Sequence, residues 1–367
     1  MITIIKMLSE EIGPRGAGSK EERKAAEYIL KSFEEKGLKS KFIVFKTIPT
    51  FSYTYILVYS LAILGIIITV MSSIIGIILM FISFILNLLE EEIYIPILTR
   101  TLSILGRESR NVIGILNEGK EKKIAIIAHY DSTKASYSFH PKRVGTLKTT
   151  IRLNFLSLAL INVLALVGYF TGYLNGLFYW LLIISIPLFV SLIVLMHREI
   201  FHKYVPGAND NASGVAVLID LIDKLKTSDK EIWFIATGSE EAGMIGMYNM
   251  LKHLKGFYII NIDNIGAGRL YYTKKEGIII KYQCKGRLKE IADEIGKKFK
   301  IEPVVYSLLP TDATPAIRRG FTCITIIALD NRGIPENYHW YNDKAEYIKE
   351  ENLIKARDFV LEIVNKI

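Results

Sequence analysis

Cysteine is scarce in this sequence, and several other common signals are missing. The two cysteines, Cys284 and Cys323, form no Cys-x-x-Cys pair and predict nothing beyond ordinary buried thiols. The first residues, MITIIKMLSEEIGPRG, lack the basic segment, apolar core and small-residue cleavage site of a secretory signal. The net charge of +9 would suit nucleic acid, but the basic residues do not form one stripe with interleaved aromatics. We therefore predict no cleaved signal peptide and no nucleic-acid partner.

Charge is absent from two long stretches, Phe51 to Leu89 and Phe155 to Met196. Each stretch is about twice the roughly 20 residues that a helix needs to cross a bilayer. Turn-forming residues interrupt both near the middle, at Ser72-Ser73 with Gly76 and at TGYLNG, 171–176. We therefore predict two transmembrane helical hairpins, the second span being short enough to be re-entrant. The predicted spans are about 53–71, 74–89, 155–170 and 177–196.

Basic residues flank these two stretches, whereas the predicted hairpin turns contain none. By the positive-inside rule, this bias places everything outside the hairpins in the cytoplasm. The chain is thus predicted to be a multi-pass integral membrane protein of about four spans with a cytoplasmic soluble part. The flanking residues are Lys41, Lys46, Arg100, Arg107, Lys142, Arg143, Lys148, Arg152, Arg198 and Lys203.

Outside the two apolar stretches, the sequence alternates between strand and helix patterns. Ser19-Lys-Glu-Glu22 is a capping box, and Gly37 ends the helix that it begins. The alternation predicts an α/β fold with a mixed, mostly parallel sheet and helices on both faces. Strands 111–116 and 123–129 stand at the spacing of a hairpin. The other predicted strands are 41–46, 231–237, 257–263, 303–306 and 322–328, with short ones near 270 and 280; the helices are 212–225, 241–254, 286–299 and one from about 350.

The apolar stretches interrupt this soluble pattern instead of following it. Segments before, between and after them must join one sheet, so they must lie on the same side of the membrane. That requires an even number of crossings in each stretch, which favours hairpins over single long helices. We predict one discontinuous domain from 1–50, 99–152 and 200–367, a first hairpin at 51–98 and a second at 153–199.

Five short polar stretches follow predicted strands, where ligands bind in an α/β sheet. Each alone is a weak signal, because a single His is more often hydrogen-bonded structure and an Asn-Asp-Asn run is more often a turn. Two histidines and several carboxylates converging in one domain are more specific. The stretches are AHYDS (128–132), GANDNASG (207–214), GSEEAG (238–243), NIDNIG (261–266) and NYHWYND (337–343).

A cluster of this composition requires cations, because carboxylates packed together without them would repel or take up protons. Imidazole with carboxylate suits zinc, with cobalt or manganese as substitutes. Two ions about 3.5–4 Å apart can activate one water and stabilise a developing oxyanion. The composition therefore predicts a cation site that suits zinc, and the two-Zn²⁺ assignment comes from the family resemblance described next.

The five stretches, in this order, resemble the M28 family of zinc-dependent exopeptidases, particularly its aminopeptidases, and GPRGAGS resembles the family's opening. The resemblance implies that Asp210 bridges two metals and that its peptide bond to Asn211 is cis. It further implies that Glu240 is the general base, taking a proton from a metal-bridging water and passing it to the leaving amine. Asp131 would support the ring of His129. One metal would be completed by His129 and Asp263, the other by Glu241 and His339.

The sequence also departs from the family pattern. Trp340 to Asn342 replace a Thr-Pro turn, and only Asp343 remains, in a supporting role. Thr311-Asp312-Ala313 lacks the histidine of the family's Ser-Asp-His loop, which affects the transfer of substrate contacts but not of metals. Tyr306 is weighed as an oxyanion donor against a buried structural tyrosine. We predict that His140, His197, His202 and His253 are not ligands.

The leading functional prediction is a membrane-anchored dinuclear zinc aminopeptidase that removes N-terminal residues from peptides. Hydrophobic or membrane-derived peptides are candidate substrates if the active site lies close to the bilayer; a plain anchor is weighed equally. The alternatives are a single-zinc glutaminyl cyclase-like acyltransferase and a non-catalytic peptide-binding relative. A transporter would need charged residues inside the spans, and only Ser, Thr and Asn occur there.

Overall fold

A computed structural model describes residues 1–367 as two compact units. The first comprises Met1–Thr50, Ser103–Ala135 and Lys203–Ile367, and the second comprises Phe51–Leu102 and Ser136–His202. Both units are therefore discontinuous in sequence. The main difference from the predicted boundaries is at 136–152, which groups with the apolar helices.

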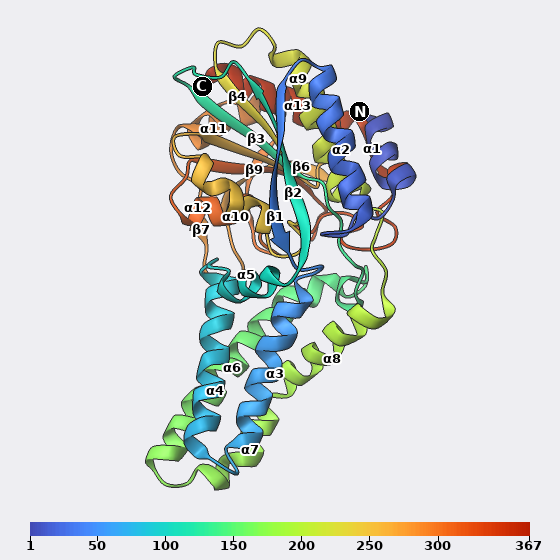
Figure 1. The fold of residues 1–367 in the computed structure, drawn as a ribbon. Helices are drawn as coiled ribbons and strands as arrows, with labels where there is room; N and C mark the ends of the chain where they lie inside the picture. Colours follow the sequence, from blue (N-terminus) through green and yellow to red (C-terminus); the bar gives the residue numbers. More distant parts are fainter. The chain divides into compact units, whose positions relative to one another are not determined.

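The first unit contains a nine-stranded mixed sheet (Figure 1). Its centre, β4-β3-β5-β9, is parallel, and antiparallel pairs flank it at β1-β2-β4 and β9-β6-β7. Strand β8 pairs with β6 in parallel. The central strands are almost entirely buried, as expected for a parallel sheet covered on both faces. The strands are β1 (Lys39–Thr47), β2 (Arg107–Leu116), β3 (Lys123–His129), β4 (Glu231–Thr237), β5 (Tyr258–Asp263), β6 (Arg269–Glu276), β7 (Tyr282–Gln283), β8 (Glu302–Tyr306) and β9 (Cys323–Leu329).

The predicted hairpin between 111–116 and 123–129 is wrong. Strand β4 lies between β2 and β3, pairing antiparallel with β2 and parallel with β3. The reason is the continuous apolar run of β3, which is buried on both faces and has parallel neighbours, β4 and β5, on both edges. A short connection allowed a hairpin, but burial placed β3 in the centre of the sheet.

Helices cover both faces of this sheet (Figure 1). Helices α2, α9 and α13 pack on one face, and α10 and α12 pack on the other. The predicted helix 241–254 is shorter in the structure, because residues 241–244 form a turn before α10. The helices of this unit are α1 (Ile2–Lys6), η1 (Met7–Ile12), α2 (Lys20–Glu35), η6 (Ala208–Ala212), α9 (Ser213–Leu225), α10 (Ile245–Met250), η7 (Leu251–His253), α11 (Arg287–Phe299), α12 (Ala313–Arg318), η8 (Ala345–Tyr347) and α13 (Glu350–Lys366).

The second unit is a bundle of apolar helices with a polar seam in its interior. Asn154 Nδ2 lies 2.8 Å from Ser191 Oγ and 3.2 Å from Tyr59 Oη. Ser83 donates to the Val58 carbonyl, so α3 and α4 are also joined by a hydrogen bond. The helices are α3 (Ser52–Ile68), α4 (Ser73–Asn87), η2 (Leu88–Glu92), α5 (Ile97–Ile104), η3 (Tyr137–Phe139), η4 (Val144–Thr146), α6 (Leu147–Phe170), η5 (Leu174–Leu177), α7 (Phe178–Ile184) and α8 (Ile186–Phe201).

Two helices of this unit are long and apolar enough to cross a membrane, Ser73–Glu92 and Val144–Phe170. The pair Leu174–Ile184 and Ile186–Phe201, bent by 47°, adds a third if it forms one span. The helix Ser52–Ile68 is apolar but shorter. These findings suggest membrane association and do not support the predicted count of four. The predicted short second span belongs instead to a 20-residue helix.

Candidate metal centre

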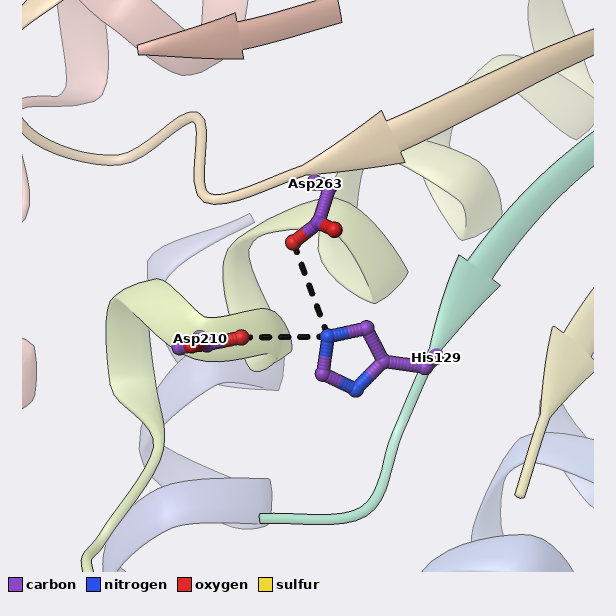
Figure 2. Close-up of side chains that lie close together, drawn as sticks. All are labelled: His129, Asp210 and Asp263. Atoms are coloured by element: carbon purple, nitrogen blue, oxygen red, sulfur yellow. Dashed lines mark ion pairs between the residues drawn. The ribbon is translucent and has the colours of Figure 1, made fainter. Parts of the chain in front are cut away.

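The ends of two neighbouring parallel strands place a histidine beside two carboxylates. His129 is the last residue of β3 and Asp263 the last of β5, while Asp210 precedes α9. His129 Nε2 lies 3.0 Å from Asp210 Oδ1 and 3.5 Å from Asp263 Oδ1 (Figure 2). All three side chains are buried and could together hold a metal ion.

A second group shares Asp210. His339 Nε2 lies 3.0 Å from Asp210 Oδ2 and 3.1 Å from Glu241 Oε1. The two oxygens of Asp210 therefore face two different histidines, one in each group. The structure thus brings all five predicted ligands together in two buried groups that could each hold a metal ion.

The donor atoms fit zinc. Bonds of about 2.0–2.2 Å in a tetrahedral site leave neighbouring ligand atoms roughly 3.3–3.6 Å apart. The separations here are 3.0–3.5 Å, so small shifts of the side chains would accommodate an ion. Asp210 Oδ2 and Glu241 Oε1 are also buried and, apart from the His339 ring nitrogen, have no hydrogen-bond donor. Buried carboxylate oxygens are rarely left in that condition unless they are paired with a cation.

The electrostatics of the cluster also favour a bound cation. Burial opposes a charge on His339, but Glu241 and Asp210 outweigh it and raise the pKa of His339 to about 9. The pKa of His129 is also raised: burial again opposes this, while Glu240 and three aspartates favour the charged ring. Burial, with a further contribution from Glu241, raises the pKa of Glu240 well above its usual range. The site therefore attracts positive charge, which a metal ion would supply.

Asp131 faces the far nitrogen of the His129 ring, with its Oδ1 3.6 Å from His129 Nδ1. The same carboxylate also holds the turn with the two glutamates. Oδ1 accepts from the Glu240 N–H at 3.0 Å and Oδ2 accepts from the Glu241 N–H at 3.1 Å. Asp131 thus lies between His129 and this turn, and its role in supporting the imidazole ring stays a prediction.

Asp343 supports the other ligand turn in the same way. Its Oδ1 accepts from the Asn209 N–H at 2.6 Å and its Oδ2 from the Asp210 N–H at 3.0 Å. The peptide bond between Asp210 and Asn211 is cis, as the family resemblance implies. Gly207 precedes this turn at φ +66°, and a Cβ there would lie 2.6 Å from the Asp210 carbonyl oxygen. A side chain at Gly207 would therefore clash with this turn, and Asp343 holds the turn through two backbone N–H groups.

No role for Arg15 is predicted from the sequence, although this residue lies within GPRGAGS. Its guanidinium is fully buried and donates to the Tyr130 carbonyl at 2.8 Å and the Gly207 carbonyl at 2.9 Å. It also donates to the carbonyls of Leu8, Gly13 and Pro206. Arg15 thus joins the loop after His129 to the loop before Asp210.

Two further residues named from the sequence lie near the cluster. Asp312 is buried and accepts a hydrogen bond from Thr237 at the end of β4, and burial raises its pKa to about 7. Tyr306 is buried at the end of β8, and burial, followed by Asp263, raises its pKa well above its usual range. A neutral phenol keeps its O–H available for donation.

Comparison with solved structures shows that zinc aminopeptidases and a glutaminyl cyclase share this fold. A zinc aminopeptidase from Bacillus subtilis matches with a TM-score of 0.58 and 17% identity, covering 100% of this chain and 93% of that one. An Aneurinibacillus aminopeptidase matches with a TM-score of 0.58, 16% identity and coverages of 100% and 92%. A Bacteroides thetaiotaomicron glutaminyl cyclase matches with a TM-score of 0.55, 16% identity and coverages of 100% and 96%.

Sequence comparison relates part of the chain to a known family. Residues 193–364 match the model of Peptidase family M28. The Bacillus subtilis aminopeptidase YwaD is 30% identical over 175 residues, 43% of this chain and 37% of that protein. The Escherichia coli alkaline phosphatase isozyme conversion protein is 37% identical over 76 residues, 18% of this chain and 22% of that protein. The chain thus matches well under half the length of these relatives, and its resemblance to M28 peptidases is confirmed.

Proposed function

We propose that this protein is a membrane-anchored, zinc-dependent aminopeptidase that removes N-terminal residues from peptides. The observation that carries the proposal is the pair of buried groups that share Asp210, with Glu240 next to the proposed ligand Glu241. Family M28 and the zinc-exopeptidase fold support a metallopeptidase. The apolar helices of the second unit support the anchor.

Two zinc ions are proposed, one held by His129, Asp210 and Asp263 and the other by Asp210, Glu241 and His339. Bound zinc would supply Lewis acidity and would lower the pKa of water. The Glu240 carboxylate accepts the proton of the attacking water and then donates it to the leaving amine. Burial raises the pKa of Glu240, which strengthens it as a proton acceptor.

Glutaminyl cyclase activity is the second candidate, because enzymes with that activity share this fold. A single-zinc cyclase would need only one of the two groups. Here both groups are complete and each contains a histidine, which favours hydrolysis over cyclisation. A non-catalytic role is disfavoured because five potential ligands and Glu240 are all retained.

The test is a substrate screen on the purified full chain in detergent, loaded with zinc. Aminoacyl reporters and short peptides with free or blocked N-termini measure hydrolysis, and N-terminal glutamine peptides measure cyclisation. We expect release of free amino acids only from unblocked peptides, loss of activity with a chelator, and recovery on adding zinc. Cyclisation without hydrolysis would establish the second candidate, and activity that resists thorough chelation would refute a zinc enzyme.

A further inference from the structure

The turn that contains both glutamates is held by side chains along its whole length. Four consecutive N–H groups, from Gly238 to Glu241, each donate to a side-chain oxygen. Asn111 Oδ1 accepts from Gly238 at 3.1 Å, and Glu22 Oε1 accepts from Ser239 at 3.1 Å. The other two acceptors are the carboxylate oxygens of Asp131. The path of this turn therefore depends on three residues that are distant in sequence.

Ser239 is the point of the turn that most needs support. Its φ of +56° lies in the left-handed region, which a serine adopts only when its surroundings hold it there. The preceding residue is closely enclosed, because a Cβ at Gly238 would lie 2.6 Å from Ser109 Oγ and 2.7 Å from the Arg110 carbonyl oxygen. Without this acceptor, the backbone of Ser239 would relax out of the left-handed region, and Glu240 would move with it.

Glu22 is the acceptor for the Ser239 N–H, and both of its carboxylate oxygens are hydrogen-bonded. Oε2 accepts from the Gly18 N–H at 2.7 Å, and the Ser19 side chain accepts from the Glu22 N–H at 3.0 Å, which completes the cap of α2. Oε1 accepts from Ser109 Oγ at 2.7 Å and from Ser239. Glu22 is only 1% exposed, so both of its oxygens lie inside the protein. One oxygen thus caps helix α2, and the other holds the turn that contains Glu240 and Glu241.

We infer that Glu22 is a positioning residue for the proposed general base: it holds Ser239 in the left-handed conformation and thereby fixes where the Glu240 carboxylate lies. This inference rests on the proposed function, in which Glu240 moves the proton. It requires no charge on Glu22, only an acceptor oxygen at the place of Oε1.

The experiment compares Glu22→Ala, Glu22→Gln and Ser19→Ala in the full chain in detergent. Ser19→Ala is the matched control, because it weakens the same helix cap and leaves the Ser239 contact in place. We expect Glu22→Ala to lower kcat by roughly 10–100-fold, the usual range for a residue supporting a metal site, with KM and zinc content near wild type. Glu22→Gln keeps one acceptor oxygen, which can serve the Ser239 N–H only when the NH2 group lies against the Gly18 N–H, and it is therefore expected to recover kcat in part.

Hydrogen–deuterium exchange gives a readout that does not depend on activity. The amides of residues 238–241 are expected to exchange faster in Glu22→Ala than in Ser19→Ala. Equal kcat and equal exchange in these two variants would overturn the inference, as would a kcat loss in Glu22→Ala that is explained entirely by lost zinc. If the zinc-loaded wild type hydrolyses no peptide, the proposed function fails, while exchange still tests whether Glu22 holds the turn.

Discussion

At the residue scale, the two adjacent glutamates differ in what faces them. Glu241 Oε1 lies 3.1 Å from His339 Nε2 and belongs to a metal-capable group, whereas Glu240 belongs to neither group. We expect Glu241→Gln to reduce bound zinc and Glu240→Gln to leave it near wild type, while both abolish turnover. The measurement is metal content by mass spectrometry beside kcat. Full zinc loss in Glu240→Gln, or unchanged zinc in Glu241→Gln, would reverse the assigned roles.

A buried carboxyl away from the cluster gives a pH prediction. Glu276 is fully buried and accepts from the hydroxyls of Thr273, Thr311 and Thr314. Burial raises its pKa, although these hydrogen bonds oppose the shift. Because the folded pKa exceeds the unfolded value of about 4.3, its stabilising contribution is complete below that pH and is lost as pH rises through the folded pKa.

Glu276→Gln removes this ionisation and keeps an uncharged group that can hydrogen-bond to the threonines. The Tm of the variant relative to wild type is therefore expected to increase as pH rises from about 4 to about 8. Thermal unfolding of both proteins across that range provides the measurement. A difference in Tm that stays constant with pH would show that Glu276 does not titrate in this window.

The site residues divide into those that the sequence predicts and those that it does not. His129, Glu241 and Asp263 end or follow strands β3, β4 and β5, so local pattern and strand polarity place them at one edge of the sheet. Asp210 and His339 do not follow strands directly: Asp210 lies between α8 and α9, and His339 lies in the loop after β9. The residues that hold the turns, Glu22, Asn111 and Arg15, have no such signal. Glu22 contacts Ser239 across 217 positions and Asn111 contacts Gly238 across 127, so only the packed fold brings them together.

At the element scale, helices α3 and α4 pack through glycine. A Cβ at Gly65 would lie 2.8 Å from the Gly76 carbonyl oxygen and 2.9 Å from the Met80 nitrogen, both backbone atoms that cannot easily move. Small residues of this kind allow apolar helices to approach closely. We expect Gly65→Ala to destabilise the bundle by about 1–3 kcal/mol through overpacking, although alanine favours helix.

The matched control for this substitution is Gly145→Ala, where an added Cβ meets nothing within 4 Å. Thermal unfolding of both variants in the same detergent gives the comparison. A lower Tm for Gly65→Ala only is the expected outcome. Equal Tm values would mean that α3 and α4 do not pack in this way.

Strand extents follow from the sequence more readily than strand neighbours. The predicted strands 123–129 and 231–237 coincide with β3 and β4, because apolar runs and turn residues delimit them. Their pairing does not follow, since a run such as IAIIA specifies burial without naming a partner. Strand β4 lies between β2 and β3 because it pairs with both, and this depends on packing in the whole sheet.

At the whole-molecule scale, sheet pairing limits how the chain can meet a membrane. Strand β1 precedes the first apolar stretch and β2 follows it, yet Lys46 pairs with Glu108 in one ladder. Strand β3 precedes the second stretch and β4 follows it, with His129 aligned to Thr237. Because paired strands lie on one side of a bilayer, each stretch must cross an even number of times. We propose that each inserted stretch crosses twice or re-enters without crossing; by length and composition, the helices alone support two spans, or three if the bent pair forms one.

Cysteine labelling tests the number of crossings in each stretch with little background, because Cys284 and Cys323 are buried. Met71 and Tyr173, at the two helix breaks, are 89% and 64% exposed, and Lys120 in the β2–β3 loop is also exposed. Helix α3 has 17 residues, about 26 Å at 1.5 Å per residue, which is slightly less than a hydrocarbon core of about 30 Å. Such a mismatch is small enough for local thinning of the bilayer to accommodate.

We therefore expect Met71→Cys and Tyr173→Cys to react with an impermeant maleimide from one side of sealed vesicles, and Lys120→Cys only from the other. Vesicles of both orientations distinguish inaccessibility from burial, and detergent should expose all three sites. Labelling of Met71→Cys from the same side as Lys120→Cys would mean that the first stretch re-enters without crossing, and the same result at Tyr173 would show this for the second. Either outcome would leave the sheet intact, because zero and two crossings both satisfy strand pairing, but it would reduce the anchor to a single hairpin or to none.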